Sequence, residues 1–247
     1  MSVDPGDRVD GLRVEVDGPI ATLVLDRPAK RNAVTYEMWL GIGAACDRLA
    51  GDPGVRLLVV RGEGEHFCAG ADIGGLGAVP VEVYRAANAA ADEALAAFPK
   101  PSVAVIRGSC VGGGVEVAAA CDLRLAAEGS RFGITPARLG IVYPGEATRR
   151  VVDLVGPSAA KHLLFSAELI DAERALRIGL IDELLGPDEL EPRVAALSTL
   201  LTEERSLLTQ MASKELIDGI AAHGTVDPEV EARWQAALAD SADAIEG

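Results

Sequence analysis

Two glycine-rich stretches, HFCAGADIGG at residues 66–75 and GSCVGGGVEVA at residues 108–118, decide how this chain is interpreted. Each follows an apolar run of strand character, and each contains small residues that let a bound molecule approach the backbone closely. The second stretch leads into a short apolar helix, where unpaired N–H groups and the positive end of the helix dipole favour a developing negative charge. Two such loops together could supply the backbone donors of an oxyanion hole.

The residues around these stretches repeat rounds of strand, loop and helix. Apolar runs predict strands over 12–16, 20–25, 56–61, 102–107 and 122–127. Helical spacing and capping residues predict helices from Thr35 to Gly51 and over 81–97 and 115–120. From Gly145 onward the pattern is helical, with segments over 146–154, 157–165, 171–178, 187–201, 205–220 and 227–240. This order predicts an α/β core followed by a helical C-terminal region.

The composition of the chain excludes several classes of function. The 247 residues carry a formal net charge of −15, which argues against nucleic acid or an anionic membrane surface as a partner. No stretch resembles a signal peptide or a membrane span, so a soluble, cytoplasmic protein is expected. The four cysteines have no Cys-x-x-Cys spacing and complete no metal-ligand pattern with the three histidines, so we expect free thiols and no metal site.

Most of the chain resembles the enoyl-CoA hydratase/isomerase, or crotonase, family. Besides the two glycine-rich stretches, the resemblance runs through residues 20–35, 55–73, 100–133 and 156–182. It implies a spiral of ββα turns over 1–190, a helical trimerisation region over 191–247, and assembly as a homotrimer or a dimer of trimers. It also implies an acyl-CoA thioester as substrate, with no cofactor beyond the coenzyme A that the substrate carries.

The resemblance assigns binding roles to residues in both stretches. The N–H groups of Ala71 and Gly113 would hold the thioester oxygen as it gains enolate charge, each contributing roughly 3 kcal/mol to transition-state stabilisation. Arg27 and Lys30 would meet the phosphates of coenzyme A, although a solvated basic loop also explains these cations. Residues expected near the adenine and the pantetheine are Ala69, Asp72 and Ile73.

Glu116 is the strongest candidate for general acid/base catalysis. It lies three residues after Gly113 in the first turn of the expected helix, and it matches the first catalytic glutamate of the hydratases. A first-turn glutamate could instead merely complement the helix dipole. Its place in the motif favours the catalytic role.

The second catalytic glutamate of the hydratases has no counterpart here, because Pro136 occupies its position. Hydration usually divides proton transfer between two carboxyl groups whose pKa values differ. Tyr143, in a context similar to the decarboxylase branch of the family, and Glu146 are two candidates that could compensate. A phenol packed at a loop and a helix-terminal charge explain these two residues equally well.

Several functions therefore remain open within one fold. Enoyl-CoA hydration is the leading hypothesis, with Ala71, Gly113 and Glu116 as its machinery. Isomerisation of an enoyl-CoA needs only one proton-shuttling carboxylate, and product analysis with a β,γ-enoyl-CoA would reveal it. Release of carbon dioxide from a malonyl-type thioester would instead indicate a decarboxylase using Tyr143. Tight acyl-CoA binding without turnover would indicate a non-catalytic binding trimer.

Overall fold

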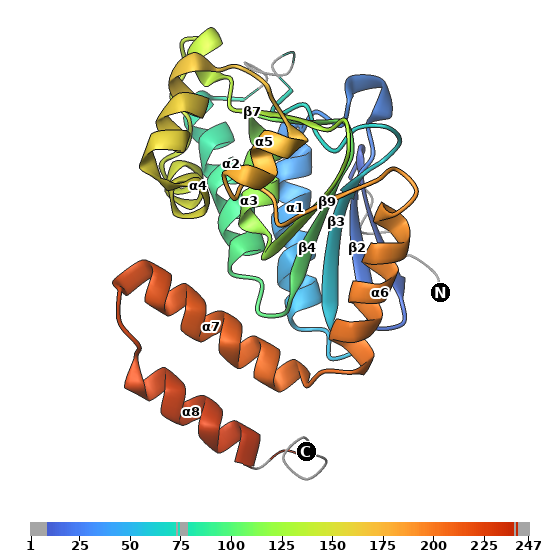
Figure 1. Cartoon of the computed structure of the whole chain (residues 1–247), viewed down its shortest axis with the longest axis vertical. Coiled ribbons are helices and arrows are strands. Elements are labelled where there is room, and N and C mark those ends of the chain that lie inside the picture. Colours follow the sequence, from blue (N-terminus) through green and yellow to red (C-terminus); the bar gives the residue numbers. More distant parts are fainter. Residues whose placement is uncertain (1–8, 73, 75–78, 240, 242–247) are drawn as a thin grey trace.

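The structure, a computed structural model, describes residues 9–72, 74, 79–239 and 241. Its main sheet has the strand order β1-β2-β3-β4-β6-β9 (Figure 1). The strands are β1 Leu12–Asp17, β2 Ile20–Leu25, β3 Leu57–Gly62, β4 Ser102–Ile106, β6 Leu123–Ala127 and β9 Glu183–Leu185. Strands β1 and β2 form an antiparallel hairpin, and the remaining neighbours are parallel. The α/β class expected from the sequence is confirmed.

Helices cover both faces of this sheet (Figure 1). On one face lie α1 Tyr36–Ala50, α2 Val81–Ala96 and α3 Gly113–Ala120, and on the other lies α6 Leu190–Glu203. Alternate strand residues divide between two apolar clusters, because successive side chains of a strand point to opposite faces. Leu58 and Val60 join the larger cluster with α1, whereas Leu57 and Val59 join the smaller one with α6. The sheet is therefore buried on both sides.

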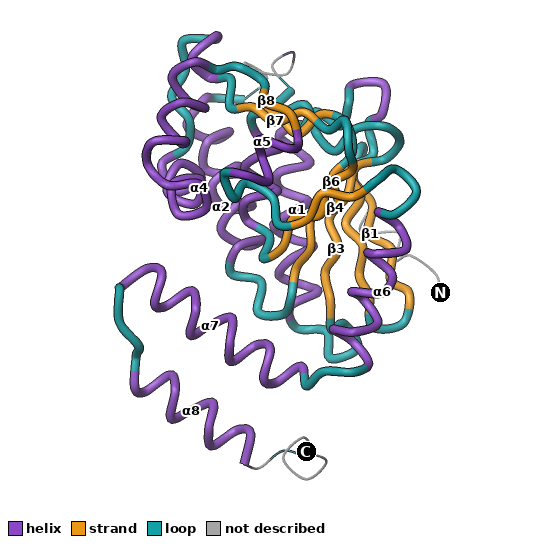
Figure 2. The backbone as a smooth tube through the Cα atoms, viewed as in Figure 1, coloured by secondary structure: helices purple, strands orange, loops and turns teal. Residues whose placement is uncertain are grey.

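A second, smaller sheet holds the two glycine-rich stretches next to each other. It consists of β5 Ser109–Val111, β7 Arg131–Gly133 and β8 Ile170–Asp171 (Figure 2). Residues 67–68 extend alongside β5, since the Phe67 N–H donates to Arg107 O and the Cys68 N–H donates to Ser109 O, both at 2.8 Å. These bonds bring the two glycine-rich stretches side by side although they are far apart in sequence.

The C-terminal part is mostly helical but not entirely so. Its helices are α4 Gly145–Ser166, α5 Ala172–Arg177, α7 Leu207–His223 and α8 Pro228–Ala239. The expectation of helices alone after Gly145 is wrong, because β8 and β9 lie there and pair with β7 and β6. Strands of two and three residues are too short to show an alternating pattern in the sequence. None of the described helices is both long and apolar enough to cross a membrane.

The division of the chain at residue 190 stays a prediction. Helix α6 begins there and packs on the sheet through Leu190 and Leu197. Helices α7 and α8 lie together beside the body of the molecule (Figure 1). Lys214 of α7 connects the pair to the body, with its Nζ 2.8 Å from Asp122 Oδ1.

Candidate active site

The two glycine-rich stretches meet where their glycines permit close backbone contact. A Cβ atom on Gly113 would lie 3.3 Å from the Ala71 backbone nitrogen, so the two expected oxyanion donors are neighbours. Gly70 has a φ of 103°, and a Cβ there would lie only 2.9 Å from Val111 O. Glycine is therefore required at position 70, and the absence of a side chain at position 113 leaves room for the close approach of one loop to the other.

The N–H groups of Ala71 and Gly113 donate to no acceptor within the described part of the chain. Their neighbours are bonded: the Asp72 N–H donates to Val34 O and the Gly112 N–H donates to Gly133 O, both at 2.8 Å. Gly113 is also the first residue of α3, where N–H groups lack partners in the helix. The arrangement leaves two adjacent donors that an external oxygen could accept from, and their role as an oxyanion hole stays a prediction.

Glu116 lies in the first turn of the same helix and is only 3% exposed. Every residue of α3 is buried, and its small side chains allow the helix to run through the core. The Asn88 Nδ2 group of α2 donates to Glu116 Oε1 at 2.8 Å. Burial, followed by the negative charge of Asp92, raises the pKa of Glu116 to about 8, although Asn88 and Arg150 act in the opposite direction. A carboxyl group with such a pKa can exchange protons near neutral pH.

A second buried carboxyl group, missed in the sequence, lies near Glu116. Asp92 follows Asn88 by one helical turn, is 4% exposed and forms an ion pair with Arg150 of α4. Arg150 also contacts Glu93, with Nη2 and Oε2 3.1 Å apart. In the sequence, Asn88 and Asp92 could be seen as two polar residues four apart on the apolar face of α2, which also buries Ala87, Ala91 and Leu95. Such a pair indicates a buried polar contact but does not identify its partner.

Tyr143 and Glu146, the two residues proposed to compensate for Pro136, lie in different environments. Tyr143 is 8% exposed, and its hydroxyl donates to Gly112 O at 3.1 Å, next to the expected oxyanion donor. Glu146 is exposed on α4, with Oε2 2.9 Å from Arg149 Nε. Pro136 is buried at the start of a short 3-10 turn, Pro136–Arg138. Tyr143 therefore lies at the site, whereas Glu146 faces solvent, and the catalytic roles of both stay predictions.

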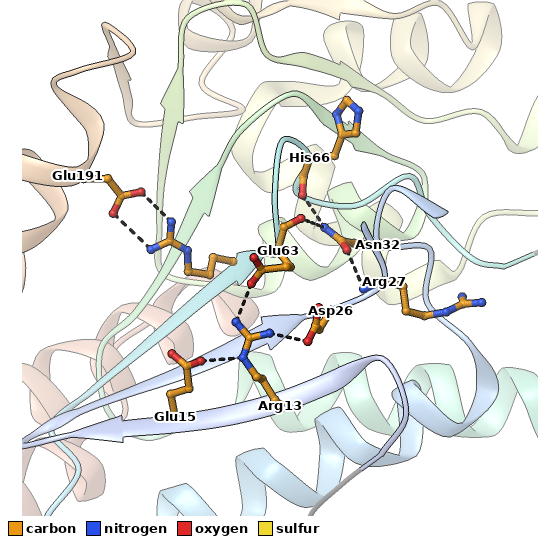
Figure 3. Close-up of polar contacts among 9 residues, drawn as sticks. Arg13, Glu15, Asp26, Arg27, Asn32, Glu63, His66 and Glu191 are labelled. Carbon is orange, nitrogen blue, oxygen red and sulfur yellow. Dashed lines mark hydrogen bonds and ion pairs between the residues drawn. The ribbon is translucent and has the colours of Figure 1, made fainter. Parts of the chain in front are cut away.

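Two of the residues expected to bind coenzyme A, Arg27 and Lys30, lie in a loop held against the first glycine-rich stretch, which contains the other three. Asn32 fixes this loop: its Oδ1 accepts from the Arg27 N–H at 2.9 Å, and its Nδ2 donates to the carbonyl oxygens of Glu63 and His66 at 2.9 and 2.6 Å (Figure 3). Arg27 Nη1 lies 2.9 Å from Asp72 Oδ2, and this contact lowers the pKa of Asp72. Arg27 and Asp72, both expected to bind coenzyme A, therefore form an ion pair with each other.

The other expected ligands of coenzyme A differ in their surroundings. Lys30 is exposed on the Pro28–Lys30 turn, while Ala69 is half-buried and its N–H donates to Arg31 O at 2.9 Å. Ile73 lies outside the described residues. The Arg27 loop thus presents Lys30 to solvent, and the binding roles of all these residues stay predictions.

Fold and site together define a class: α/β proteins in which two adjacent backbone N–H groups accompany a buried carboxyl group. The family model described as enoyl-CoA hydratase/isomerase matches residues 15–247. The chain is similar to a crotonyl-CoA hydratase of Syntrophomonas wolfei, with 33% identity over 215 residues, covering 85% of this chain and 83% of that protein. The chain therefore belongs to the enoyl-CoA hydratase/isomerase family, as its motifs led us to expect.

Solved structures agree with this assignment. An enoyl-CoA hydratase/carnithine racemase from Magnetospirillum magneticum superposes with a TM-score of 0.90 at 28% identity, covering 97% of this chain and 91% of that chain. An enoyl-CoA hydratase from Bacillus anthracis gives a TM-score of 0.87 at 25% identity, covering 96% and 94%. The crotonase fold expected from the sequence is confirmed.

Proposed function

We propose that this protein is an enoyl-CoA hydratase that adds water across the conjugated double bond of a 2-enoyl-CoA. The observation that carries the proposal is the buried Glu116 in the same helical turn as the Gly113 N–H, which itself neighbours the Ala71 N–H. The site thus combines a proton-transferring group with donors for an anionic oxygen. The similarity to a crotonyl-CoA hydratase of Syntrophomonas wolfei supports the same reaction.

One carboxyl group suffices for this chemistry when it acts twice. Because Asn88 occupies Oε1 of Glu116, Oε2 is the oxygen left for the substrate. Ionised Oε2 takes a proton from water as the hydroxyl oxygen bonds to Cβ, and the electron pair of the double bond moves onto the thioester oxygen between the two N–H groups. The Oε2–H group then returns the proton to Cα as the enolate collapses. Both additions occur from the face of Glu116, so hydration is syn.

Isomerisation of an enoyl-CoA is the second candidate, because Pro136 fills the place of a second carboxyl group. The same oxygen of Glu116 would remove a proton from Cα of a β,γ-enoyl-CoA and return it to Cγ, with the enolate held by the same donors. No water enters that reaction. The two functions are distinguished by their products, a 3-hydroxyacyl-CoA or a conjugated enoyl-CoA.

The proposal also includes the expectations about the cofactor, the binding partner, the assembly and the location. The substrate supplies coenzyme A, and neither reaction written above needs a metal or a redox cofactor. Membership of the family supports an acyl-CoA thioester as the binding partner. A homotrimer or a dimer of trimers and a cytoplasmic location are consistent with the family resemblance.

The test is a product assay with crotonyl-CoA that follows both the loss of conjugation and the formation of 3-hydroxybutanoyl-CoA. Glu116→Gln preserves the size of the side chain but cannot accept the proton, so we expect kcat to fall by about 10²–10⁴-fold. Glu128→Gln, an exposed site in a turn, is the matched control and should leave kcat unchanged. Hydration by the Glu116→Gln protein at the wild-type rate would refute the role of Glu116.

If the wild-type protein does not hydrate crotonyl-CoA, the hydratase proposal is wrong. A β,γ-enoyl-CoA is then supplied, and appearance of the conjugated isomer identifies an isomerase. Carbon dioxide release from a malonyl-type thioester identifies the decarboxylase alternative, and tight acyl-CoA binding without any product identifies the non-catalytic one.

A further inference from the structure

Tyr143 contacts the peptide unit that carries one of the two expected oxyanion donors. Its hydroxyl donates to Gly112 O at 3.1 Å, and this carbonyl belongs to the same peptide group as the Gly113 N–H. The Glu116 N–H donates to the same carbonyl at 3.2 Å. A carbonyl oxygen has two lone pairs, so both donors can be accommodated. The hydroxyl of Tyr143 and the expected substrate oxygen therefore lie at opposite ends of one peptide dipole.

This peptide needs an anchor because glycines flank it on both sides. Gly112 has a φ of 56° and a ψ of −115°, a conformation that residues with a side chain rarely adopt. The Gly112 N–H is held by Gly133 O, which fixes the preceding peptide but not the orientation of the next one. A peptide between glycines can rotate more easily than others. The bonds to Gly112 O thus fix the direction in which the Gly113 N–H points.

The Tyr143 hydroxyl stays a donor throughout the working range of pH. Burial, followed by the negative charges of Glu116 and Asp92 and the nearby thiols of Cys110 and Cys68, raises the pKa of Tyr143 well above its usual range. Arg150 is bonded to Asp92 and to Glu93. The phenol therefore remains protonated, and its hydrogen can point to Gly112 O.

A hydrogen bond accepted by a peptide carbonyl also strengthens the donor at the other end. The bond polarises the peptide group, so a hydrogen bond donated by its N–H becomes stronger, by roughly 10–30%. In a buried site this effect is less screened by water. The Gly113 N–H therefore becomes a better donor for the thioester oxygen, provided that its direction is also maintained.

We propose that Tyr143 is a positioning residue of the anion site, acting through the Gly112–Gly113 peptide to aim and polarise the Gly113 N–H rather than by touching substrate. The proposal rests on the proposed function for the identity of the bound group, an acyl-CoA thioester. It differs from a direct role in binding a substrate carboxylate, because the hydroxyl hydrogen is already donated to the protein.

The experiment measures the thioester carbonyl directly, without catalysis. Butanoyl-CoA isotopically labelled at its carbonyl has no double bond to hydrate, and infrared difference spectra report how far binding lowers its C=O stretching frequency. In Tyr143→Phe the ring remains and only the hydroxyl is lost. We expect a smaller frequency shift and nearly unchanged affinity for butanoyl-CoA. We also expect kcat for crotonyl-CoA to fall about tenfold, less than the roughly 10²–10³-fold loss on removing an oxyanion donor itself.

The matched control is Thr202→Val, which removes another buried hydroxyl that donates to a backbone carbonyl, Ser198 O at 2.8 Å within α6. This helix packs on the opposite face of the sheet, so the carbonyl frequency and kcat should match the wild type. A second variant carries 3-fluorotyrosine at position 143, whose hydroxyl is a stronger donor. It should enlarge the frequency shift, and a purely structural role for Tyr143 predicts no such increase.

The outcomes separate this proposal from the proposed function. An unchanged carbonyl frequency in Tyr143→Phe overturns the positioning role, whatever the activity. A large loss of butanoyl-CoA affinity also overturns it, because it indicates direct contact with the ligand. If the wild type shifts the carbonyl frequency and Tyr143→Phe reduces that shift, but crotonyl-CoA is not hydrated, the positioning role stands and the hydratase function falls.

Discussion

At the scale of single residues, the protonation of Glu116 controls the reaction that we propose. Its pKa of about 8 means that the carboxyl group is mostly protonated at neutral pH, whereas the mechanism begins with the ionised form. The value of kcat/KM should therefore rise about tenfold per pH unit below the pKa and level off above it. A profile that instead falls as the pH rises through this range would show that the protonated form starts the reaction.

Two neighbours of Glu116 should move this profile in opposite directions. The negative charge of Asp92 raises the pKa of Glu116, so Asp92→Asn should shift the rise to lower pH. The hydrogen bond from Asn88 lowers the pKa, so Asn88→Ala should shift the rise to higher pH. The measurement is kcat/KM for crotonyl-CoA against pH in each variant. Shifts in the same direction in both variants would contradict this account and would indicate general damage to the site.

The sequence identified Glu116 but not these neighbours. Glu116 lies within a local motif, and its position after three glycines can be interpreted without tertiary information. Asn88 and Asp92 act on it from another helix, and Arg150 from a third, so their proximity depends on how α2, α3 and α4 pack. No regularity of spacing along the chain encodes that contact.

At the scale of elements, the packing of α3 against the first glycine-rich stretch sets the spacing of the donors. A Cβ on Gly114 would lie 2.5 Å from Cys68 O, so Gly114→Ala must push the helix away from that stretch. We expect a loss of about 1–3 kcal/mol in the free energy of unfolding and a fall in kcat. Gly219→Ala in α7 is the control, because a Cβ there meets nothing within 4 Å. Thermal unfolding of both variants tests this, and equal stability would disprove the steric argument.

Helices and longer strands were predictable, whereas strands of two or three residues were not. Thr35 caps α1 as expected, with its Oγ1 accepting from the Met38 N–H at 3.2 Å. The strands β2 and β4 and the helix α2 also lie within about a residue of their expected bounds. Strands β5, β7, β8 and β9 have two or three residues and exist because partners from distant parts of the chain pair with them. Hydrogen bonding between segments, rather than local propensity, creates these strands.

At the scale of the whole molecule, the α7–α8 pair exposes apolar surface that a single chain does not cover. In α7 only Ala212 is buried, while Ile217 and Ile220 are 63% and 43% exposed. Burying such side chains against another subunit would stabilise the assembly by roughly 25 cal/mol for each Å² of apolar surface. We therefore expect this face to contribute to the homotrimer implied by the family resemblance.

Light scattering coupled to size-exclusion chromatography tests this expectation. The wild type should have three or six times the 25.6 kDa mass of one chain. The double variant Ile217→Glu with Ile220→Glu places charges on the exposed face of α7, where they would be desolvated without partners in an interface, so its mass should fall to that of one chain. Val16→Glu, at an exposed apolar site on the edge strand β1, is the control and should keep the wild-type mass. A monomeric wild type would refute the trimer, whereas a trimeric double variant would place the interface elsewhere on the molecule.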